Sequence, residues 1–154
     1  MQYIFTIFQL KGDMTMENKE KKYYSFFNAN KCVGTNGEFV GVTTIVTLSN
    51  IQKKDVNGKA VVNARARISN RSRTMEAVLG APVQADADGS VWVDVAFWED
   101  RAERFMRYVG DRERVRVVLV GTMLQRTFTK NDGTEGKAVV INATDWANAE
   151  KESK

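Results

Sequence analysis

Residues 91–98, VWVDVAFW, separate into two alternating sets of side chains. In an extended strand, successive side chains point to opposite faces of the sheet. One face then holds three valines and Phe97, whereas the other holds Trp92 and Trp98. The valine row has the character of a core face, so this strand predicts two large aromatic side chains on the face away from the core.

The segments before this strand show the same alternation. Residues 38–50 are rich in Val, Ile, Thr and Phe and predict a first strand, broken or bent at Gly41. An Asn-Gly pair within residues 55–59 predicts a tight hairpin turn into a second strand. The inward positions of that strand are small or apolar: Ala60, Val62, Ala64, Ala66 and Ile68. Residues 71–90 lose the alternation and predict a long connection.

The segments after the strand predict one helix and two more strands. Residues 99–110 place their apolar side chains at helical spacing and end in glycine, which is typical of a short amphipathic helix. Residues 114–128 alternate again and predict a fourth strand. A hairpin turn, KNDGTEG, then leads to a last strand over 137–147.

This order of elements predicts an all-β fold, a five-stranded OB-fold barrel with one short helix between strands 3 and 4. A split sandwich is the competing architecture, but it would normally have more strands and does not account for the single helix. We expect residues 1–37 to form an N-terminal arm, part of which could be disordered, residues 38–147 the barrel, and residues 148–154 a short polar end.

The composition argues against catalysis and against a membrane protein. The chain has 154 residues, no histidine and one cysteine, Cys32, which excludes an internal disulfide and the usual histidine bases and zinc sites. We expect no enzyme activity, no cofactor and no metal. The apolar start, MQYIFTIFQL, lacks a basic segment and is too short to span a bilayer, so we expect a cytoplasmic protein. Residues 1–13 could be a leader from an upstream start, since Met14 and Met16 follow.

Four pieces of this sequence, in this order, resemble the bacterial single-stranded DNA-binding protein family over about two thirds of the chain. They are GKAVVNARARI, VWVDVAFW, the helix AERFMRYVG, and GTMLQRTF with its Asp-Gly hairpin. The resemblance implies an OB-fold that binds single-stranded DNA without sequence preference and assembles as a homo-oligomer, a dimer or a tetramer. It also implies that Trp92, Trp98 and Phe128 stack on bases.

The alternation and the resemblance agree on the tryptophans, since a groove for single strands needs flat side chains on which bases stack. Two alternatives stay open. The tryptophans could be covered by the N-terminal arm or by a partner subunit, because aromatic residues are also enriched at protein interfaces. Trp98, at the entry to the helix, could instead plug the end of the barrel.

Basic residues accompany these aromatics, and the net charge is +4. Arginines on one sheet face can pair with phosphates and stack on bases, although a charged row can also be merely solvated. Asp94 lies among them, and we expect it to pair with a neighbouring arginine. The residues expected to contact DNA are Lys59, Arg65, Arg67, Arg71, Arg73, Arg114, Arg116 and Arg126.

The ends of the chain depart from the family. The family typically has a long tail with an acidic tip, whereas this sequence stops at NAEKESK, which indicates a tailless variant such as those of plasmids, phages or conjugative elements. We expect residues 16–35 to reach an adjacent protomer, or alternatively to cover the open end of their own barrel. An OB-fold that binds single-stranded RNA, or one that serves only as a protein-interaction module, is the alternative function.

Overall fold

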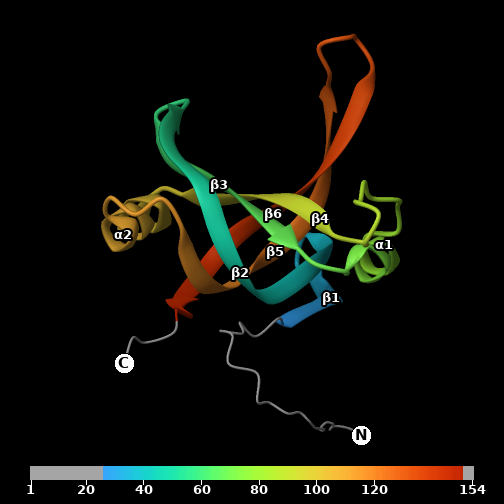
Figure 1. The fold of residues 1–154 in the computed structure, drawn as a ribbon, viewed down its shortest axis with the longest axis horizontal. Coiled ribbons are helices and arrows are strands. Elements are labelled where there is room, and N and C mark those ends of the chain that lie inside the picture. Colours follow the sequence, from blue (N-terminus) through green and yellow to red (C-terminus); the bar gives the residue numbers. More distant parts are fainter. Residues whose placement is uncertain (1–25, 151–154) are drawn as a thin grey trace, which may run out of the picture.

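The computed structural model describes residues 26–150, which form six strands and two short helices (Figure 1). The strands are β1 (Phe26–Gly34), β2 (Gly37–Val56), β3 (Lys59–Ile68), β4 (Val91–Trp98), β5 (Val115–Thr129) and β6 (Glu135–Asn148), and the helices are α1 (Ser72–Leu79) and α2 (Asp100–Val109). Within residues 26–150, no helix combines the length and the apolar character needed to cross a membrane.

Five of the strands close into a barrel in the order β2-β3-β4-β6-β5, with β5 pairing back onto β2. The β4–β6 pair is parallel and the other pairs are antiparallel. Strand β2 serves both sides of the closure, because its first half pairs with β5 and its second half with β3. This arrangement confirms the all-β, OB-fold-like barrel with α2 between the third and fourth barrel strands.

The pairing of β2 is continuous at Gly41, where the sequence predicted a break or bend, and is irregular elsewhere. Gly41 pairs in register with Asn30 on one side and Thr122 on the other. The irregularity falls instead between Ser49 and Gln52, where β2 passes from one partner strand to the other. Asn50, between them, has a positive φ of 54°. The irregularity therefore coincides with the change of partner strand, and the strand is not broken at Gly41.

Two elements were absent from the sequence prediction. Residues 71–90, expected to be an irregular connection, contain α1, of which only Met75 is fully buried. Such a short helix with a single core residue leaves little periodic signal. Residues 26–34, expected to belong to the arm, form β1 and pair with β2 from Phe26 opposite Ile45 to Gly34 opposite Gly37. This part of the expected arm therefore lies on its own barrel, while residues 1–25 and 151–154 are outside the described chain.

The predicted core row is confirmed. Val91, Val93, Val95 and Phe97 are almost completely buried inside the barrel. Phe97 stacks on Phe105 of α2 at a centroid distance of 4.0 Å, and Trp146 of β6 meets both rings edge-on. One row of β4 side chains therefore packs into the core, and the alternate row points to the outer face of the sheet.

Candidate functional site

The outer faces of β3, β4, β6 and β5 form one continuous surface. Arg65 on β3 lies opposite Asp94 on β4, which lies beside Val140 on β6. Val140 in turn lies opposite Leu124 on β5. The β2–β3 and β5–β6 hairpins both extend beyond the barrel on the same side (Figure 1). Side chains far apart in the sequence are therefore neighbours on this surface.

A groove of about 830 Å³, here called the main groove, lies on this surface. Its lining includes Trp92 and Phe128, and each of these side chains is 45% exposed. Arg65, Arg126 and Lys137 line the same groove. The groove thus combines two accessible aromatic faces with three cations, which is the combination that single-stranded nucleic acid requires.

A smaller groove of about 310 Å³, here called the Trp98 groove, continues along the same face. It shares Arg65, Asp94 and Arg126 with the main groove and is also lined by Trp98. The indole Nε1 of Trp98 donates a hydrogen bond of 3.4 Å to Oδ1 of Asn142 on β6. Trp98 is partly buried, so its ring is held at the barrel wall with one part facing the groove.

Asp94 pairs with an arginine, as expected from the sequence. Nε of Arg65 lies 3.2 Å from Oδ1 of Asp94, the residue directly opposite it on β4. The Arg65 guanidinium carbon is also 5.3 Å from the centre of the Trp92 ring. The carboxylate is therefore neutralised within the groove, and the guanidinium is held next to the aromatic surface.

Arg67 lies next to Trp92 on the neighbouring strand but has acidic partners of its own. Its Nη2 is 2.8 Å from Oδ2 of Asp88, and its Nε is 3.8 Å from Oδ2 of Asp86. Hydrogen bonding from Ser90, whose backbone N–H donates to Oδ1 of Asp88 at 3.0 Å, and next the contact with Arg67, hold the pKa of the Asp88 carboxyl below its usual value. A phosphate would have to replace these carboxylates to bind Arg67.

The remaining predicted cations lie in three places. Lys59, at the β2–β3 hairpin, is exposed and lines neither the main groove nor the Trp98 groove. Arg71 and Arg73 lie at the start of α1, and Arg73 lines a separate depression with Asp86 and Asp88. Arg114 and Arg116 line a third groove, which also contains Trp92. The structure thus gathers Trp92, Trp98, Phe128, Arg65 and Arg126 on one face and places the other cations around it.

Several residues that line these grooves did not stand out in the sequence. Lys137 in the main groove and Lys54 in the Trp98 groove flank the two hairpin turns. Gln52 and Asn63 add amide groups to the Trp98 groove. The available signal was the position of both lysines beside the Asn-Gly and Asp-Gly turns, since these hairpins project beside the sheet face (Figure 1).

No protein-family model matches this sequence, and no curated protein matches it. Solved structures similar to this one include the small single-stranded DNA-binding protein of Streptomyces coelicolor, which is 12% identical in sequence. The match covers 71% of this chain and 94% of that chain, with a TM-score of 0.49. The second single-stranded DNA-binding protein of Mycobacterium smegmatis shows 16% identity, covers 70% and 86% of the two chains, and has a TM-score of 0.42. A mitochondrial single-stranded DNA-binding protein of S. cerevisiae shows 9% identity, covers 74% and 98%, and has a TM-score of 0.44.

Proposed function

We propose that this chain binds and coats single-stranded DNA without sequence preference. The observation that carries the proposal is the pairing of Trp92 and Phe128, both 45% exposed, in one groove with Arg65 and Arg126. Bases stack on the aromatic rings, and arginines neutralise the phosphates between them. Both features recognise parts that every nucleotide shares, so the binding is indifferent to sequence.

The same groove disfavours duplex DNA. In a duplex the bases already stack on one another and present only their edges, so an aromatic platform adds nothing to binding. The charge around the groove is also mixed, because Asp86 and Asp94 line it together with the cations. Affinity therefore depends on stacking in addition to phosphate contacts, and this favours the unpaired strand.

The proposal extends to assembly and to the cellular role. The sequence resemblance supports a homo-oligomer, a dimer or a tetramer, that acts in the cytoplasm in replication, recombination or transfer of a mobile element. Sedimentation of the full chain with and without oligo-dT measures the oligomer directly. A protein that stays monomeric under both conditions would remove this part of the proposal and leave the binding itself intact.

Titration of fluorescent oligo-dT tests the proposed function, with duplex DNA and single-stranded RNA as competitors. We expect oligo-dT to bind more tightly than duplex, with an affinity that falls by about 0.7 log units per log unit of salt for each phosphate neutralised. Equal binding of duplex and oligo-dT would contradict the proposal. Preference for the RNA competitor would support the alternative RNA-binding function, and absence of any binding would support a protein-interaction module.

A matched control separates groove aromatics from exposed aromatics in general. Phe39 on β2 is 42% exposed, similar to Phe128, but it lines a different depression. We expect Phe128→Ala to weaken binding of oligo-dT and Phe39→Ala to leave it unchanged. Equal losses in the two variants would show that the main groove is not the binding site.

A further inference from the structure

A third groove, of about 380 Å³, adjoins the main groove and is here called the arginine groove. The two grooves share one lining residue, Trp92. The arginine groove is also lined by Arg67 of β3, by Arg114 and Arg116 at the start of β5, and by Thr47 of β2. Trp92 therefore stands at the junction of two separate depressions.

The charge of the arginine groove differs from that of the main groove. Three of its lining residues are arginines, and none of the described residues that line it is an aspartate or a glutamate, although Arg67 pairs with Asp86 and Asp88 outside this groove. The main groove, in contrast, includes Asp86 and Asp94 in its lining. A concave surface with one sign of charge attracts a polyanion more strongly than a mixed one. The arginine groove is thus suited to phosphates, and its single tryptophan lies at its border with the main groove.

The arginine groove meets the main groove at Trp92, which lines both. Arg116 lies opposite Thr47 across the β5–β2 pair, and Arg67 lies opposite Trp92 across the β3–β4 pair. All four residues line the arginine groove. From Trp92 the surface continues to Arg126 in the main groove. A band of cations therefore crosses the strands of the barrel on both sides of Trp92.

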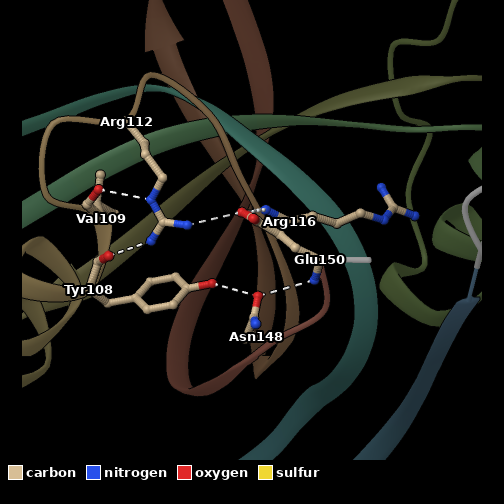
Figure 2. Close-up of polar contacts among 6 residues, drawn as sticks. All are labelled: Tyr108, Val109, Arg112, Arg116, Asn148 and Glu150. Atoms are coloured by element: carbon tan, nitrogen blue, oxygen red, sulfur yellow. Dashed lines mark hydrogen bonds and ion pairs between the residues drawn. The ribbon is translucent and has the colours of Figure 1, made fainter. Parts of the chain in front are cut away.

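The position of Arg116 is fixed by contacts at the end of β6. Its backbone N–H donates to Oε2 of Glu150, which also pairs with Arg112 at 3.2 Å. Asn148 accepts hydrogen bonds from Tyr108 and from the backbone N–H of Glu150. Figure 2 shows the Arg116 side chain running away from this cluster. Its Nη1 donates to Oγ1 of Thr47 at 2.9 Å, so the guanidinium is held at the arginine groove before any ligand binds.

We propose that the strand bound in the main groove continues past Trp92 into the arginine groove, where Arg114 and Arg116 contact its phosphates. This inference rests on the proposed function and adds a second segment to the binding site. A short oligonucleotide would fill only the stacking part. A longer one would reach both parts, within the range of about 4 to 16 nucleotides that one OB-fold covers.

The test compares two lengths of oligo-dT, about 5 and about 15 nucleotides, within the range known for OB-folds. The variant Arg114→Ala/Arg116→Ala removes two cations from the arginine groove. The control Arg101→Ala/Arg107→Ala removes two cations from α2, outside the three grooves. We expect the salt dependence of binding the long oligonucleotide to decrease by about 1.4 log units per log unit of salt, two phosphates at about 0.7 each, with the short one unaffected. The control variant should leave the salt dependence unchanged for both oligonucleotides.

Each other outcome has a separate meaning. Wild-type protein that binds neither oligonucleotide would refute the proposed function and this inference with it. Binding of the short oligonucleotide, with no change in the salt dependence for the long one in the groove variant, would overturn the inference alone. If Arg114→Ala/Arg116→Ala changed the oligomeric state and left the salt dependence unchanged, the arginine groove would be assigned to contact with a second copy of the chain. The single variant Arg114→Ala, at an exposed position, repeats the test with a smaller structural change and an expected decrease of about 0.7.

Discussion

Arg65 lies between Asp94 and Trp92, with its Nε 3.2 Å from the carboxylate and its guanidinium carbon 5.3 Å from the ring centre. The ion pair and the ring contact act on the same side chain in opposite ways. The carboxylate cancels the charge that a phosphate would use, whereas the ring holds the guanidinium in the groove. We expect the balance between them to set how much Arg65 contributes to the proposed binding of single-stranded DNA.

We expect Asp94→Asn to strengthen binding of oligo-dT. Both side chains of the ion pair are 48% exposed, so its loss should cost at most about 1 kcal/mol of folding stability. The freed cation can neutralise about one more phosphate, which makes the salt dependence steeper by about 0.7 log units. Salt titration of binding measures this, with Asp111→Asn, an exposed carboxylate after α2, as the control. Weaker binding in Asp94→Asn would show instead that Asp94 acts by positioning Arg65.

Two tryptophans should respond in opposite ways to alanine. Trp92 is 45% exposed in the main groove, so Trp92→Ala should lose about 1 to 3 kcal/mol of binding with little change in melting temperature. Trp146 packs edge-on against Phe97 and Phe105, so Trp146→Ala should destabilise the fold by on the order of 3 kcal/mol. Thermal melts and titrations of both variants check this. A collapse of melting temperature in Trp92→Ala would mean that the ring serves the core.

Gly136 leaves space for the ring of Phe128. The two residues lie opposite each other on β6 and β5, and a Cβ at Gly136 would come within 2.5 Å of Cζ of Phe128. The Cβ would also lie 2.9 Å from Cε of Lys130. Because both obstacles are the far ends of side chains, Gly136→Ala should displace the ring and preserve the fold. We expect weaker binding of oligo-dT, and no further loss in Gly136→Ala/Phe128→Ala beyond Phe128→Ala alone. Additive losses would place the effect of Gly136 elsewhere.

The loop between α1 and β4 should restrain Arg67. Asp86 and Asp88 both pair with it, so Asp86→Asn/Asp88→Asn should free the guanidinium for phosphate and raise the affinity for oligo-dT. An equal rise in the triple variant that also carries Arg67→Ala would show that the effect is only a general loss of negative charge. Titration of the two variants side by side provides the measurement.

Asp88 should also make the folding stability of the protein depend on pH. The pKa of Asp88 is lowered in the folded chain by Ser90 and then by Arg67, so its stabilising effect is fully present above its ordinary unfolded pKa of 3.8. That effect is lost as the pH falls through the lower folded value. We expect Asp88→Asn to melt below the wild type near neutral pH and the two melting temperatures to converge in acid. A constant difference down to the lowest pH would contradict this.

Much of the fold was predictable because strand alternation is a local signal. The core row of β4, the helix α2 with its terminal Gly110, and the two hairpin turns follow from neighbouring residues and were found where expected. The two elements that the sequence did not predict have weak local signals. Helix α1 buries only Met75 completely, and β1 carries no row of buried side chains. Their formation depends on packing against the rest of the barrel.

The sequence by itself determined that Trp92 lies on the outer face of β4, because side-chain direction in a strand alternates whatever its neighbours are. Only the tertiary structure decided that Phe128 shares its groove, because β6 lies between β4 and β5 in the closed barrel. It also decided that Arg67 pairs with Asp86 and Asp88, residues that follow an intervening helix. Contacts across strands and loops depend on strand order and closure, and no local pattern of hydrophobic and polar residues encodes these.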